Sequence, residues 1–96
     1  MYEVEQTAEF AGWLHGLRDR MARKRIVMRV ERLAIGLLGD WKSLGDGVSE
    51  LRVDHGPGYR IYYTLRGQTV IILLCGSAKR DQDQAIRLAK RLVKDV

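Results

Sequence analysis

Basic side chains on both sides of one short loop could together bind a phosphate group. Arg52 precedes the loop 54–58 and Arg60 follows it, while Lys79 and Arg80 lie further along the chain. An arginine can donate two hydrogen bonds to a phosphate, and crowded cations favour a polyanionic ligand because it relieves their repulsion. The 2′-hydroxyl of RNA is an internal nucleophile, so such a site could cleave RNA without a metal, by orienting it and stabilising charge on the phosphate. We therefore predict that these four cations act in catalysis.

Neighbouring side chains suit the same chemistry. His55 lies in the loop and is a candidate for moving a proton near neutral pH, although an ordinary loop histidine fits the sequence as well. Tyr59 and Tyr62 are candidates for stacking on bases, and Arg66 and Arg87 for contacting RNA. The sequence shows no cluster of metal ligands, no P-loop and no G-x-S-x-G motif, so we expect neither a metal nor another cofactor.

Three segments that hold these residues have the pattern of strands. Val48–Val53 and Tyr59–Arg66 alternate between apolar and polar residues, and Thr69–Cys75 is almost wholly apolar, as in a strand covered on both faces. The loop 54–58 contains two glycines and the one proline of the chain, and its shortness predicts antiparallel pairing. We expect a small sheet, mostly antiparallel.

Alternation along these strands predicts which side chains share a face. Arg52 and Arg60 become near neighbours, and the basic pair after the third strand reaches the same edge of the sheet. Cations placed together repel, so a phosphate ligand would explain the arrangement. The alternative is a solvated strand face on which Arg52 pairs with a carboxylate of its own segment, Glu50 or Asp54.

Helical spacing precedes the sheet. Tyr2–Glu5 alternates like a short strand, and Thr7 can cap a first helix. A second helix is predicted from Asp19 to Leu38, followed by Gly39 as a left-handed cap, and the short link predicts a helical hairpin. One face of the second helix carries basic residues, for which we weigh a solvated surface against contact with RNA or an acidic partner: Arg25, Arg29 and Arg32.

A final helix completes the predicted order βααβββα, an α+β fold. Asp81 can cap this helix, with Gln84 three residues on as its capping-box partner. The 96 residues suit one domain, 1–96. The acidic start 1–5 lacks a signal-peptide core and no apolar stretch nears 20 residues, so we expect a cytoplasmic protein that does not enter the membrane.

The charge of the chain is uneven. Residues 1–58 hold nine basic and nine acidic side chains, whereas residues 59–96 hold eight basic and three acidic ones, which accounts for the net charge of +5. A local excess of this kind suits a polyanionic partner. The single cysteine, Cys75, excludes an internal disulfide and lies in an apolar run, where we expect a small buried side chain rather than a catalytic thiol.

The segment Glu50–Tyr63, with the sequence ELRVDHGPGYRIYY, resembles the signature of the RelE/HigB toxins in the RelE/ParE superfamily, in particular the branch of addiction-module killer proteins. The similarity covers nearly the whole chain, since the first helix and the strand Val70–Gly76 followed by Lys79 match that branch too. It implies a compact RelE-like sheet with two helices packed on one face. It also implies a type II toxin that cleaves mRNA on the ribosome and is neutralised by a helix-turn-helix antitoxin, with DNA bound only through the antitoxin complex.

The resemblance also implies roles for single residues. Arg60 matches the strand arginine that contacts the scissile phosphate, Arg52 falls where a second basic residue lies, and Lys79 with Arg80 matches a basic pair after the last strand. Glu50 departs from the pattern, since RelE has a lysine there. The catalytic tyrosine near the C-terminus of RelE falls close to Ile86, and no tyrosine follows Tyr63 in this chain. A histidine used by HigB-type toxins is also missing, which leaves His55 or Tyr62 as substitute acid or base.

Two other functions fit the same sequence. ParE relatives share the fold but inhibit DNA gyrase and cleave no RNA. The missing C-terminal acid or base favours them, while the closer match to the killer proteins argues against them. A third possibility is an interaction module without activity of its own.

Overall fold

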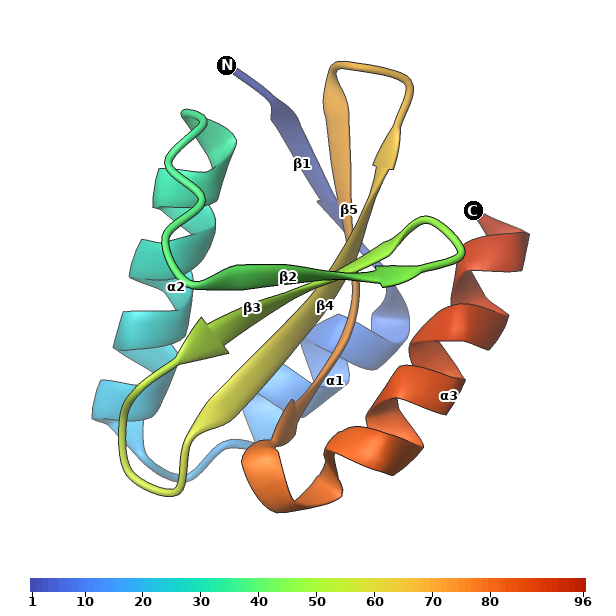
Figure 1. Ribbon diagram of the computed structural model, residues 1–96. Coiled ribbons are helices and arrows are strands. Elements are labelled where there is room, and N and C mark those ends of the chain that lie inside the picture. The colour runs from blue at the N-terminus through green and yellow to red at the C-terminus, as the bar shows by residue number, and fades with distance from the viewer.

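The computed structural model describes residues 1–96 and has the predicted α+β class (Figure 1). Five strands form one mixed sheet in the order β1-β5-β4-β3-β2, in which β1 runs parallel to β5 and all other neighbours are antiparallel. In chain order the elements are β1 (Glu3–Gln6), α1 (Ala8–Gly16), α2 (Arg20–Ala34), β2 (Trp41–Gly45), β3 (Val48–Val53), β4 (Tyr59–Arg66), β5 (Val70–Ala78) and α3 (Gln82–Leu92).

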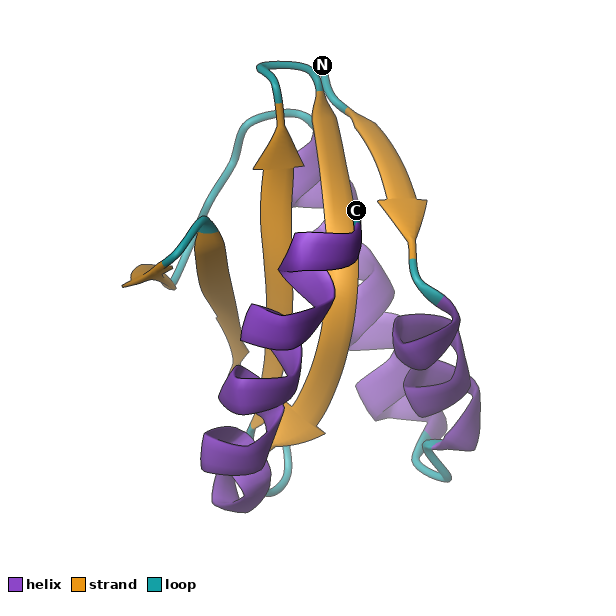
Figure 2. Ribbon diagram, turned by 90° about the vertical axis from the view of Figure 1, so that its right-hand side faces the viewer, coloured by secondary structure: helices purple, strands orange, loops and turns teal.

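Helices cover both faces of the central strands. Figure 2 shows α3 in front of β4 and β5 and α2 behind them. On the α1–α2 side, Phe10, Ile26 and Leu33 pack against Leu51, Ile61 and Ile71 from the sheet. On the α3 side, Ala85 and Ala89 pack against Tyr62, Ile72 and Leu74. The apolar run in β5 is therefore buried on both faces, as predicted, because its alternate side chains enter two separate cores.

The Thr7 cap predicted for the first helix is present, and the second helix also begins with a side-chain cap. The Thr7 hydroxyl accepts a hydrogen bond from the Phe10 amide at 3.0 Å and donates to the Leu74 carbonyl at 2.6 Å. Asp19 caps α2 by accepting from the amides of the second and third helical residues. Each cap satisfies amides that the helix itself cannot, and the Thr7 cap also ties α1 to β5.

The second helix ends earlier than predicted, at Ala34 rather than Leu38. Gly36 adopts a φ of +89°, and its amide donates to Leu33 while the Leu37 amide donates to Arg32. These two bonds form a Schellman motif, in which glycine tolerates the left-handed backbone. The apolar residues beyond it suggested more helix, yet they lie exposed in the connection to β2.

The strand β2 is an addition to the predicted order, which becomes βααββββα. It forms a tight hairpin with β3, whose turn places Gly45, Asp46 and Gly47 at positive φ. Four of the five β2 residues are exposed at the edge of the sheet. An edge strand with little to bury carries no alternation, so its sequence gave no period-two signal.

One extra residue in β5 changes which of the following side chains in this strand face each of the two cores. Tyr62 pairs with Cys75 and Tyr63 pairs with Leu73, so Leu74 has no partner and forms a bulge. Cys75 therefore packs on the α3 side and is buried, as predicted. Gly76 then lies under the Trp13 indole, where any Cβ would overlap the ring.

The start of the last helix differs in detail from the prediction. Lys79–Asp81 form a 3₁₀ turn, and the Asp81 side chain makes no capping hydrogen bond. Instead, Asp81 lies 3.6 Å from the Arg80 guanidinium, so the predicted capping box with Gln84 is absent. None of the helices has the length and apolarity required to cross a membrane.

Candidate functional site

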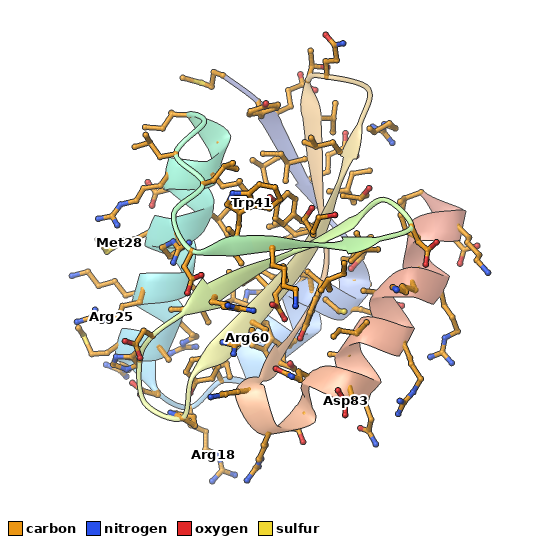
Figure 3. The ribbon with its side chains drawn as sticks, viewed as in Figure 1. Arg18, Arg25, Met28, Trp41, Arg60 and Asp83 are labelled. Atoms are coloured by element: carbon orange, nitrogen blue, oxygen red, sulfur yellow. The ribbon has the colours of Figure 1, made fainter.

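A polar cleft of about 370 Å³ lies where the β3–β4 loop meets the end of β5. Its charged lining comes from Arg52 on β3, Arg60 on β4, Lys79 after β5, and the carboxylates of Asp40 and Asp54. The backbone of residues 56–58 forms another part of its wall. We call this space the arginine cleft. Figure 3 shows Arg60 near the end of β4 that leads into this loop.

The hairpin geometry brings the three cations together. Arg52 and Arg60 are direct partners in the antiparallel register, so their side chains share a face. The Lys79 amide donates to the Gly58 carbonyl at 2.9 Å, which ties the loop to the start of the last helical segment. Gly58 has a φ of +84°, a conformation that favours glycine. Three of the four cations expected to converge therefore do so.

A buried carboxylate lies between the two arginines. Glu50 is 3% exposed, with one oxygen 3.2 Å from Arg52 Nε and the other 3.6 Å from Arg60 Nε. The intrastrand pair that the sequence offered as an alternative is thus present, and the same carboxylate also serves Arg60. The repulsion between Arg52 and Arg60 therefore does not require a phosphate, contrary to prediction, because Glu50 relieves it.

The remaining charges leave the arginine cleft formally balanced. Its three cations are matched by Glu50 and by the lining carboxylates Asp40 and Asp54. The balance is uneven in space, however, because Arg52 Nη1 lies 3.8 Å from an exposed Asp40 and Lys79 has no carboxylate within 4.0 Å. Guanidinium and ammonium donors in such a cleft can still bind a phosphate oxygen.

His55 points away from the arginine cleft, contrary to prediction. Its Nε2 lies 3.1 Å from the carboxylate of Asp19, the residue that caps α2, and it does not line the cleft. The bond from the Ala22 amide and then the bond with His55 lower the pKa of Asp19 below its usual 3.8. His55 therefore fastens the β3–β4 loop to α2 through its Nε2 atom.

The two tyrosines predicted to stack on bases are buried. Tyr62 is fully covered on the α3 side, where its hydroxyl lies 3.5 Å from that of Ser77, and burial raises its pKa to about 12. Tyr59 is 7% exposed on the opposite side and contacts Trp13 edge to face. Neither ring is available to a base. Alternation alone could not show that α3 covers the polar side of β4.

Three other predicted cations lie outside the arginine cleft. Arg80 is 86% exposed and pairs with the adjacent Asp81. Arg66 lies at the far end of β4 and pairs with Glu5 at 3.1 Å. Arg87 is exposed on α3 and does not line the cleft. None of the three contributes to the cluster formed by the β3–β4 hairpin.

Two carboxylates in the cleft were missed as functional candidates. Asp54 follows Arg52 by two residues, so strand alternation could have assigned it to the same face. Asp40 could not be placed in this way, because it reaches the cleft through β2, the strand that the sequence did not reveal. The structure shows no group of three or more histidine, cysteine or acidic side chains placed to hold a metal.

The mixed sheet with two helices on one face and a third on the other is consistent with the RelE-like fold. The chain belongs to the family described as phage derived protein Gp49-like (DUF891), whose model matches residues 13–94. This family is associated with toxin–antitoxin systems. The chain is also 40% identical over 94 residues to an uncharacterized protein of Haemophilus influenzae, which covers 98% of this chain and 95% of that protein.

Proposed function

We propose that this protein is the toxin of a type II toxin–antitoxin module and a metal-independent endoribonuclease of the RelE/HigB type that cleaves mRNA on the ribosome. The association of its family with such modules supports the toxin role. The observation that carries the nuclease role is the direct pairing of Arg52 and Arg60 across the β3–β4 hairpin, beside Lys79 in one cleft. An antitoxin, of helix-turn-helix type by the resemblance, silences the toxin and carries the complex to DNA.

The cleft supplies groups for each step of the reaction. The two guanidiniums hold the nonbridging oxygens of the scissile phosphate and stabilise the charge that grows on them. Asp54 accepts the proton of the 2′-hydroxyl as O2′ bonds to phosphorus. The P–O5′ bond breaks, and the Lys79 ammonium gives its proton to the leaving O5′. The products are a 2′,3′-cyclic phosphate and a 5′-hydroxyl end.

The test uses purified protein, mRNA and ribosomes in the presence of a chelator. The expected result is cleavage that leaves cyclic phosphate ends and is absent when the 2′-oxygen at the cut site is methylated. Arg60→Ala should lower the rate by roughly 10²–10³-fold, because it removes a donor to the transition state. Arg66→Ala is the matched control, since it removes an arginine of the same strand outside the cleft. Equal rates in the two variants would refute the assigned site.

The antitoxin needs its own experiment. Expression of this chain alone should stop growth, and co-expression of the protein encoded by an adjacent reading frame should restore it. A complex of the two proteins that binds the operator, where this chain alone does not, is the expected result. Growth that continues on induction of this chain alone would refute the toxin role.

A second candidate function is inhibition of DNA gyrase, as in ParE-like toxins. The observation that favours it is the lack of the expected acid or base, since His55 is bound to Asp19 and Tyr62 is buried. A supercoiling assay with purified gyrase separates the two functions. Loss of supercoiling together with intact RNA would select gyrase as the target.

A further inference from the structure

A second hollow, of about 240 Å³, adjoins the arginine cleft. It lies between α2 and the end of β3, and we call it the α2 hollow. Its lining consists of Arg25, Met28, Arg29 and Arg32 from the helix and of Val53 and Asp54 from the strand. Val53 and Asp54 also line the arginine cleft, so the two spaces meet at these residues. Figure 3 shows Arg25 and Met28 on the outer side of α2.

The cations of the α2 hollow lack the compensation found in the cleft. Arg25 and Arg32 are exposed, and no carboxylate lies within 4.0 Å of either guanidinium. Arg29 donates to the carbonyls of Arg52 and Leu38, which are neutral acceptors and leave its charge uncompensated. Three arginines therefore face the single carboxylate of Asp54. Of the two spaces, the α2 hollow therefore has the larger excess of positive charge.

Arg29 also fixes the geometry between the two spaces. Its guanidinium binds the backbone of Arg52, so the helix is held against the strand that carries a cleft arginine. Gly39, which follows the Leu38 carbonyl that Arg29 binds, has a φ of +62°, a conformation that favours glycine. Arg25 and Arg32 lie seven residues apart on one side of the helix, a spacing of about 10 Å along its axis. Their two guanidinium groups form a row along the helix, from which both can donate hydrogen bonds to a neighbouring chain.

We propose that the α2 hollow binds the phosphodiester backbone of the same single-stranded RNA whose scissile phosphate lies in the arginine cleft, with Arg25 and Arg32 as its phosphate contacts. The proposal rests on the nuclease function and names the path of its substrate. Continuity through Val53 and Asp54 favours RNA over an acidic protein segment, because a strand leaving the cleft enters the hollow directly. The charge balance assigns different tasks: the cleft positions one phosphate, and the hollow supplies most of the long-range attraction.

The test measures binding apart from cleavage. The probe is a fluorescent 2′-O-methyl oligouridylate of about 12 nucleotides, which cannot undergo internal attack, and its anisotropy is followed as salt rises. Arg25→Ala/Arg32→Ala should weaken binding roughly tenfold at low salt and flatten the slope of log affinity against log salt by about 1.4, the value for two lost single-strand contacts. The control Arg20→Ala/Arg23→Ala removes two arginines of α2 that do not line the hollow, and its slope should stay within about 0.5 of wild type.

The outcomes separate this proposal from the nuclease function. If the wild-type protein cleaves no RNA but the two pairs of variants differ as expected, the hollow binds RNA and the nuclease assignment fails. If both pairs weaken binding equally, or Arg25→Ala/Arg32→Ala binds like wild type, the hollow is not an RNA site. If that variant keeps oligouridylate but loses a polyglutamate of equal charge, the hollow takes an acidic protein instead. Circular dichroism verifies that each variant is folded.

Discussion

Two arginines of β4 show how differently the two ends of one strand can use the same residue. Arg60 and Arg66 are six residues apart and share a face, and each lies near a carboxylate. The side chain of Arg60 is 12% exposed and that of Glu50 only 4%, whereas Arg66 and Glu5 are each about half exposed. The Arg60 end is therefore largely buried, whereas the Arg66 end opens to solvent.

The two ends differ in the free energy that each carboxylate would cost if it lost its cationic partner. A surface pair such as Arg66–Glu5 contributes about 0–1 kcal/mol, since water screens it and both side chains lose entropy in forming it. A buried carboxylate without a partner is far more costly. Glu50 must therefore keep its cations, and it holds Arg60 and Arg52 in fixed positions beside the arginine cleft. Preorganised donors of this kind are what phosphate chemistry requires.

The largest difference in stability should come from replacing the glutamate at each end of β4 by glutamine. We expect Glu50→Gln to lower the free energy of unfolding by roughly 2–3 kcal/mol, somewhat below a fully buried pair because Arg52 is about one-third exposed. Glu5→Gln should cost less than about 1 kcal/mol. Urea denaturation of the two variants measures both values.

The same exchange should affect RNA binding in the opposite sense. Without the Glu50 charge, Arg60 loses its carboxylate partner and Arg52 keeps only the exposed Asp40. Glu50→Gln should therefore bind 2′-O-methyl oligouridylate more tightly while being less stable. Equal stability losses in the two glutamate variants would show that burial does not distinguish the two ends of β4.

The strands around the cleft were predictable because apolar and polar residue types alternate in their sequences, even though most of their side chains are buried. Val48–Val53 and Tyr59–Arg66 have the bounds that the sequence indicated, and their pairing followed from the short loop. The bridging role of Glu50 was not predictable, since the sequence offered it as a partner of Arg52 alone. A side chain that reaches two neighbours on different strands becomes visible only when the register is known.

A smaller difference in stability is expected between alanine substitutions at two glycines. One glycine lies at the Arg60 end of the sheet, and the other has open space around it. Gly76 pairs with Ile61 and lies beneath Trp13, so Gly76→Ala forces the indole to move and should cost about 2 kcal/mol. Gly12 has no heavy atom near its missing Cβ, so Gly12→Ala should raise stability by up to about 1 kcal/mol through helix propensity.

Denaturation followed by tryptophan fluorescence compares the two glycine variants. Because Trp13 contacts Tyr59, the first residue of β4, Gly76→Ala should also reduce cleavage, whereas Gly12→Ala should not. A Gly76→Ala protein as stable as wild type would mean that the indole has room elsewhere and that this end of the sheet is less tightly packed than the structure indicates.

The site residues that sequence reasoning misplaced share one physical cause. His55 and Tyr62 have the right chemical types beside the right arginines, but a loop histidine can turn either way and a strand tyrosine can face a helix. The Asp19 carboxylate, which caps α2, draws His55 away from the cleft. Helix α3 covers Tyr62, so this side chain is buried in the core instead of being available in the cleft. Contacts with residues far along the chain determine where both side chains point. The alternation within one strand contains no information about such contacts.

The smallest effect should come from the Asp19–His55 contact, which fastens the loop at the Arg60 end. The pKa of Asp19 is lower in the folded protein than its ordinary 3.8, chiefly because of the Ala22 amide and then His55. The contribution of its charge to stability is therefore present above about pH 3.8 and is lost as the pH falls through the lower, folded-state pKa. Asp19→Asn keeps a capping oxygen but cannot ionise, so its deficit in unfolding free energy should shrink below that pH.

Denaturant titrations of wild type and Asp19→Asn between neutral pH and acid provide the measurement. Asp19→Ala, which removes the cap as well, should be less stable than Asp19→Asn at every pH. Hydrogen exchange of the amides in residues 54–58 should quicken at neutral pH in both variants, because the loop loses its charged anchor on α2, while the β4–β5 turn near Arg66 should be unaffected. A deficit of Asp19→Asn that stays constant with pH would show that the cap geometry, rather than the charge shared with His55, holds the loop in place.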